Sequence, residues 1–162
     1  MDSCDVEGLE PLLPEIWISK LETVATSLKD DGLDKAALGR NLRLAFHLCL
    51  LAPEPLRIKG LDRTCGACME ALLEARQFDC AAMLLLGTNP ELEIQSSEKG
   101  ANARVRLAAR EAVGVAIGAT LGQAVLAAIV DCLMMDYALN QEILSYPVAG
   151  DRPHRYQSGS HL

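Results

Sequence analysis

Cys65 and Cys68 are the residues of this chain whose spacing is most typical of a chemically active site. Thr64 stands just before them and can cap a helix, so both thiols are predicted in its first turn. A helix N-terminus favours the thiolate form, and two thiols at this spacing can form a reversible disulfide. The motif therefore predicts a dithiol redox site, although the segment before it, 56–64, is charged and does not read as a buried strand.

A metal site is the second chemical possibility. Cys65, Cys68 and Cys80 offer three sulfur ligands for zinc, and His47, Cys49 or His154 could supply a fourth. Structural zinc sites usually show two close ligand pairs, and this chain has one. The plainest interpretation is that Cys65 and Cys68 are small residues that pack at a helix start. No serine, histidine or carboxylate pattern assembles a catalytic set, so we do not expect an enzyme.

The charge distribution limits the classes of partner. The 162 residues carry a net charge of -7, and residues 1–31 hold eight acidic side chains against two lysines. An acidic chain without a basic stripe argues against nucleic acid as a direct ligand. The first residues are acidic and no apolar signal segment follows them, which predicts a cytoplasmic protein with reduced thiols.

Helical periodicity dominates the chain. Trp17, Leu21, Val24 and Leu28 share one face of a helix predicted over 14–29. Further helices are predicted over 34–52, 64–77, 79–86 and 102–144, which gives a mostly α fold of about five helices with a long, buried C-terminal helix. We expect an acidic N-terminal segment over 1–13, one helical domain over 14–146 and a flexible tail over 147–162.

The segment 91–107 is ambiguous. Leu92 and Ile94 alternate with polar residues, Val105 and Leu107 do the same, and 98–102 could form the turn between them. A β-hairpin over 91–107 would make the fold α+β, and the last helix would then begin near Ala108.

The stretch 112–130 contains no charged residue and has glycines at 114, 118 and 122. On a helix, Gly114, Gly118 and Gly122 would lie on one face and let a second helix approach closely, in the same chain or in a symmetric partner. The stretch is also nearly long enough to span a bilayer. We expect a buried helix of a soluble protein, with a membrane-anchored helical protein as the alternative.

These features favour a protein that works by binding another protein, or a copy of itself, without catalysis. In its small size, acidic charge and abundant leucine, the chain resembles type III secretion chaperones. This resemblance implies a chaperone-like or adaptor role. The predicted partner surface is the apolar end of the last helix, at Met134, Met135 and Leu139, because methionine adapts to irregular surfaces. The alternatives are a CxxC redox or zinc-binding protein and a membrane-anchored protein.

Overall fold

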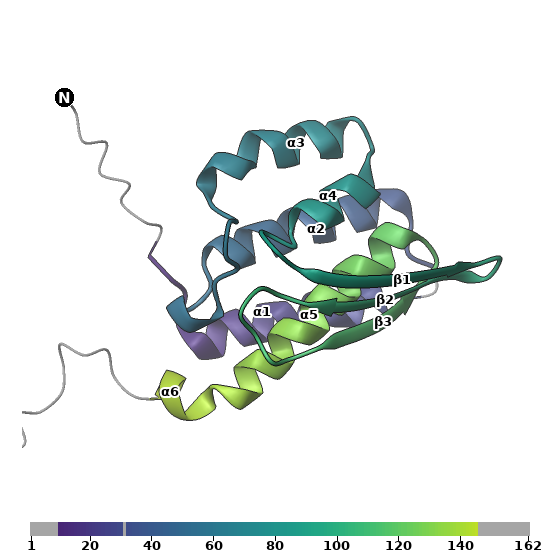
Figure 1. The fold of residues 1–162 in the computed structure, drawn as a ribbon. Coiled ribbons are helices and arrows are strands. Elements are labelled where there is room, and N and C mark those ends of the chain that lie inside the picture. Colours follow the sequence, from purple (N-terminus) through teal and green to yellow (C-terminus); the bar gives the residue numbers. More distant parts are fainter. Residues whose placement is uncertain (1–9, 31, 146–162) are drawn as a thin grey trace, which may run out of the picture.

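The computed structural model describes residues 10–30 and 32–145, and it shows a helical first half followed by a small sheet and a long helix (Figure 1). The elements in chain order are α1 (Pro14–Leu28), α2 (Lys35–Leu50), the 3-10 turns η1 (Glu54–Leu56) and η2 (Arg63–Cys65), α3 (Gly66–Glu74), α4 (Phe78–Leu84), β1 (Glu91–Ser97), β2 (Gly100–Arg106), β3 (Gly114–Gly118), α5 (Leu121–Leu139) and α6 (Gln141–Ser145). The predicted tail, 147–162, and residues 1–9 of the predicted acidic segment, 1–13, lie outside the described residues.

The first two helices form as their sequences predict. The apolar face of α1 is buried at Trp17, Leu21, Val24 and Leu28. The indole Nε1 of Trp17 donates a hydrogen bond to the Leu48 carbonyl, 2.8 Å away, so the ring is fixed between α1 and α2. Asp34 caps α2 by accepting a hydrogen bond from the amide of Ala37 at 2.7 Å.

The predicted helical content is confirmed, but the second half of the chain adds a small antiparallel sheet, so the fold is mixed α+β, as the alternative expected. β1 and β2 form the antiparallel hairpin, with Leu92 opposite Val105, and β3 adds to the other side of β2. Gly100 opens β2 at φ 137°, a conformation that L side chains rarely adopt. A helix over 102–144 is excluded, because residues 102–106 and 114–118 are strands.

The long C-terminal helix is present but begins at Leu121, where Thr120 caps it by accepting a hydrogen bond from the amide of Gln123. α5 packs against the inner face of β2 and β3 and also against α1 and α4 (Figure 1). Eleven of its residues are buried, so it is the central element of the core. The side-chain amide of Gln123 donates to the Leu28 carbonyl at 2.9 Å and joins α5 to the end of α1.

The neutral stretch 112–130 is not one helix. Its first part forms β3, because Val115 and Ile117 alternate with small residues and the Thr120 cap starts the helix only afterwards. Gly114 and Gly118 therefore belong to a strand and Gly122 to a helix, and the three do not line one helix face. The alternative of a helical membrane span over 112–130 therefore lacks the continuous helix that it requires.

Among the described residues, one helix, Leu121–Leu139, is long and apolar enough to cross a membrane by length and composition alone. The most apolar 18-residue window of this helix has a mean hydropathy of 1.4, and 61% of the window is buried inside the protein. A core helix of a folded domain has the same properties, so this feature is weak support for an anchor.

A nearly buried ion pair ties the β2–β3 connection to α5. Arg110 Nη1 lies 2.9 Å from Asp136 Oδ2, and the two side chains are 9% and 5% exposed. Arg110 Nη2 also donates to the Arg57 carbonyl in the loop after η1. Three segments that are distant in the sequence are thus held at one point.

Candidate protein-binding site

The CxxC motif lies at the surface, where η2 passes into α3. Cys65 is half-buried, Cys68 is exposed, and neither is in a disulfide. The Cys65 sulfur lies 3.9 Å from Oδ1 of Asp62 and 3.9 Å from the Gly60 carbonyl, so it contacts a carboxylate and a backbone oxygen. The dithiol function stays a prediction that the geometry does not strengthen.

The same carboxylate has a structural role. Asp62 accepts hydrogen bonds from the amide and the hydroxyl of Thr64, which caps the turn that leads into α3. The Thr64 hydroxyl bond is the main cause of a lowered pKa at Asp62, with smaller contributions from the Thr64 and Cys65 amides and the Cys65 thiol. Asp62 is therefore ionised at neutral pH beside the predicted redox motif.

No metal-binding cluster is found in the described part of the chain, where no group of three or more His, Cys, Asp or Glu side chains could hold an ion. Cys65, Cys68 and Cys80 are thus not gathered into a common site, although all three are accessible. Cys49 and Cys132 are buried in the core, and burial raises the pKa of both thiols, to about 12 for Cys49.

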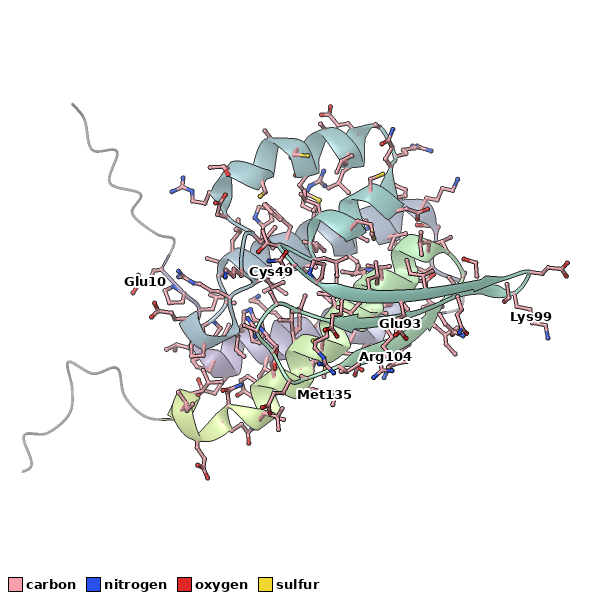
Figure 2. All side chains as sticks on the ribbon, viewed as in Figure 1. Glu10, Cys49, Glu93, Lys99, Arg104 and Met135 are labelled. Atoms are coloured by element: carbon pink, nitrogen blue, oxygen red, sulfur yellow. The ribbon has the colours of Figure 1, made fainter. Side chains whose placement is uncertain are left out.

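The outer face of the sheet carries exposed side chains from all three strands. Figure 2 shows Glu93 and Arg104 on this face and Lys99 at the projecting tip of the hairpin. Arg104 Nη1 lies 4.0 Å from Glu93 Oε2, and Arg106 Nε lies 3.5 Å from Glu91 Oε2. Such exposed pairs add little stability, but they neutralise the charge on β1 and β2.

Strand β3 carries the apolar part of this face. Val115 is 59% exposed and Ile117 is 76% exposed, and both stand opposite β2 residues, Arg104 and Asn102, that face outward. No described helix covers them, because α5 packs on the other face of the sheet. Two neighbouring β-branched side chains exposed on an edge strand are unusual, since edge strands normally carry charges that prevent pairing.

The backbone of β3 has one free side. The sheet order is β1-β2-β3, so β3 pairs only with β2 among the described residues. The Val115 amide does not reach β2; it donates to Asp131 Oδ2 of α5 at 3.0 Å. Since alternate residues of a strand point their amides to opposite sides, the Ile117 amide and the Val115 and Ile117 carbonyls also face the free edge.

Asp131 therefore occupies the Val115 amide, which a partner strand could otherwise use, and places a carboxylate at this point of the edge. It is half-buried, and no described cation forms an ion pair with it. The next free-edge amide, at Ala119, donates to the Gln123 side chain at 3.3 Å. The open positions of the edge thus lie between two side chains of α5, around Ile117.

The glycines explain how α5 comes this close to β3. A Cβ on Gly118 would lie 2.5 Å from the backbone nitrogen of Ala124, and one on Gly114 would collide with the Ala128 carbonyl. Gly122 instead faces α4, where its amide donates to Asp79 Oδ1 at 2.8 Å. The close approach expected at these glycines occurs between a strand and a helix and between two helices of one chain.

The predicted surface at the end of α5 is partly accessible. Met134 is half-buried and packs against the core, whereas Met135 and Leu139 are 44% and 67% exposed. Figure 2 shows Met135 on α5, away from the outer face of the sheet. This surface stays a prediction, separate from the edge of β3.

The chain matches no protein-family model, no curated protein and no solved structure. The functional interpretation therefore depends on the geometry of the sheet. The sequence prediction missed Val115, Ile117 and Asp131 as site residues. The alternation of Val115 and Ile117 with Gly114, Ala116 and Gly118 was the available signal for a strand with one apolar and one small-residue face.

Proposed function

We propose that this protein is a non-catalytic, chaperone-like or adaptor module that binds a strand of another protein along the free edge of β3. The single observation that carries the proposal is the exposure of Val115 and Ile117 beside a backbone edge that no described strand pairs. A strand added to such an edge gains backbone hydrogen bonds, and its alternate side chains extend the apolar surface.

The chemistry of the edge favours a basic partner strand. Asp131 contributes a carboxylate without a cation at the point where the added strand would begin, and the chain as a whole carries a charge of -7. A partner strand that alternates Val or Ile with Lys or Arg would place apolar side chains next to Val115 and Ile117 and a cation near Asp131. Charge complementarity of this kind raises association rates and selects partners.

A second copy of the chain fits the edge less well. Antiparallel pairing centred on Val115 would bring two Asp131 carboxylates to the same place, and like charges there oppose association. Pairing centred on Ile117 would need the Ala119 amide, which already donates to Gln123. We therefore propose a strand of another protein as the occupant, and the experiment below also tests whether a second copy of the chain binds there instead.

The experiment is selection from a display library of random peptides about 12 residues long, followed by amide exchange on the complex. We expect selected peptides to alternate β-branched and basic residues and to slow exchange at the Ile117 amide. The variant Val115→Lys with Ile117→Lys should lose at least about tenfold in affinity. The control Ile16→Lys with Leu44→Lys, which changes exposed apolar residues of α1 and α2, should bind as the native chain does.

Four results would contradict the proposal. Peptides that bind without protecting Ile117, or that bind the β3 variant and the control equally, would place the interaction elsewhere. Loss of binding in Met135→Lys with Leu139→Lys would assign it to the end of α5. A dimer in sedimentation that Val115→Lys with Ile117→Lys dissociates would show that a second copy occupies the edge.

A further inference from the structure

A groove among the helices of the first half of the chain gathers basic side chains, although the chain as a whole is acidic. It lies between the first half of α2 and the turn that joins α3 to α4, and it has a volume of about 450 Å³. Four of the chain's 15 basic residues line it, namely Lys35, Arg40, Arg43 and Arg76. A volume of this size accommodates a few side chains of a ligand.

Most of this charge is not neutralised inside the protein. Arg43 forms a two-bond pair with Glu70, with both N–O distances at 2.9 Å. Asp34, on the rim, is engaged as the cap of α2. Among the described residues, the side chains of Lys35, Arg40 and Arg76 have neither a hydrogen bond nor an ion pair. Glu74 also lines the groove and acts electrostatically on Arg43, so an excess of positive charge remains at Lys35, Arg40 and Arg76. A cleft with an excess of one sign of charge concentrates ligands of the opposite sign.

The floor of the groove is apolar. Leu73 is buried there, and the ring of Phe78 is half-buried. Gly39 stands over this ring, and a Cβ at that position would lie 3.3 Å from Phe78 Cε1. The absence of a side chain at Gly39 lets α2 lie close to this ring, and the part of Phe78 that stays exposed gives the groove an apolar contact between charged side chains.

The backbone at Arg76 adds a second, independent observation. Arg76 has φ 55° at the end of α3, where its amide donates to the Leu73 carbonyl and the Gln77 amide to the Leu72 carbonyl. This is a Schellman ending, in which glycine normally occupies the left-handed position. An arginine there is less stable than a glycine would be, because its Cβ crowds the neighbouring carbonyl in the left-handed conformation. Such a cost is typical of residues kept for function.

From these observations we infer that the groove binds an acidic peptide segment that carries one leucine or aromatic anchor between Asp or Glu residues. The anchor contacts Leu73 and Phe78, and the flanking carboxylates pair with Lys35, Arg40 and Arg76. Nucleic acid fits less well, because its repeated phosphates would extend beyond the groove onto a surface of net negative charge. The site is independent of the β3 edge and of the function proposed for it.

The experiment screens the same type of display library against the full chain and sorts the selected peptides by the variants of the chain that they still bind. We expect a second set of peptides, rich in Asp and Glu with one apolar anchor, that still binds Val115→Lys with Ile117→Lys. Binding of a synthetic member of this set should weaken at least about tenfold between about 0.05 and 0.5 M NaCl. Arg40→Glu with Arg76→Glu should abolish it, and the neutral Arg40→Gln with Arg76→Gln should weaken it by a smaller factor.

The matched control is Lys20→Glu with Lys99→Glu, which makes the same change in net charge on α1 and at the hairpin tip, and it should retain binding. The inference is overturned if no acidic peptides are enriched, if the control loses binding as strongly as the groove variant, or if a single-stranded DNA oligonucleotide displaces the peptide with equal affinity. Basic, strand-forming peptides would be unaffected by the groove variants, so failure of this site and failure of the β3 site give different results.

Discussion

Arg110 and Asp136 form an ion pair 2.9 Å long that is almost entirely removed from solvent. The pair joins the loop after β2 to the last third of α5, and the second guanidinium nitrogen reaches the Arg57 carbonyl. Removing one member of a buried pair leaves the other charge without a partner, which costs more than the pair contributes when intact.

Asp136→Asn is therefore expected to lower the free energy of unfolding by about 3–5 kcal/mol. Urea denaturation followed by circular dichroism measures this change. The double variant Arg110→Met with Asp136→Leu removes both charges and should recover most of the loss. Equal destabilisation of the single and double variants would show that packing, not the unpaired charge, sets the cost.

Gly118→Ala tests the contact between β3 and α5. The added Cβ would lie 2.5 Å from the backbone nitrogen of Ala124. Because no flexible side chain can move aside there, β3 or α5 must shift. We expect a loss of about 2 kcal/mol or more in thermal or urea unfolding. The control is Gly66→Ala, where the nearest atom, on the Phe46 ring, is 3.9 Å away. That variant should be neutral or more stable, because alanine is the better helix former.

Arg76→Gly separates stability from binding. Glycine adopts the positive φ of this position without strain, so the melting temperature should rise by about 2–4 °C, corresponding to about 1 kcal/mol. The same change removes a cation from the basic groove and should weaken the acidic peptide severalfold. A variant that is more stable and binds equally well would exclude Arg76 from the groove's function.

Cys49 gives the protein a pH dependence on the alkaline side. Burial raises the pKa of its thiol to about 12, whereas the unfolded chain ionises near the ordinary thiol value. The unfolded state thus binds fewer protons between about pH 9 and pH 12, so stability present below pH 9 is lost as the pH rises, by up to about 1.4 kcal/mol per pH unit. Urea titrations at several pH values should show a shallower decline for Cys49→Ala.

The CxxC motif allows a direct test of the redox prediction. Cys68 is exposed and Cys65 is half-buried, so both should be alkylated in the native protein, whereas Cys49 and Cys132 should react only on unfolding. After mild oxidation, peptide mass spectrometry would reveal a Cys65–Cys68 disulfide that a reductant reverses if the dithiol prediction is right. Because Cys65 is half-buried and Cys68 is exposed, we expect Cys65 to be alkylated more slowly than Cys68.

The sequence predicted the helical half of the fold more completely than the second half. Trp17, Leu21, Val24 and Leu28 repeat over four turns, and their burial follows from that period. The strands are short, and β3 continues into α5 through a stretch without charged residues, so charge patterning does not mark the boundary. The hairpin was recognised only as an alternative, because alternation over a few residues is also compatible with a helix or a loop.

The candidate sites depend on tertiary contacts that no local pattern contains. Asp131 reaches Val115 only because Gly114 and Gly118 let α5 approach the strand. The basic groove joins residues of α2 with residues near the start of α4, and their charges are scattered in the sequence. A close contact at Gly114 and Gly118 was expected on a helix face, whereas in the structure it forms between strand β3 and α5 of the same chain.

The place of the sole tryptophan determines how these experiments can be observed. Trp17 is fully buried, donates to the Leu48 carbonyl, and has the ring of Tyr137 at 6.4 Å, so its environment depends on α1, α2 and α5 together. Its fluorescence should report global denaturation of the helical layer with a single strong transition. Ligands seated on β3 would leave that emission unchanged, and their detection requires a dye or an isotope placed on the ligand or on the sheet.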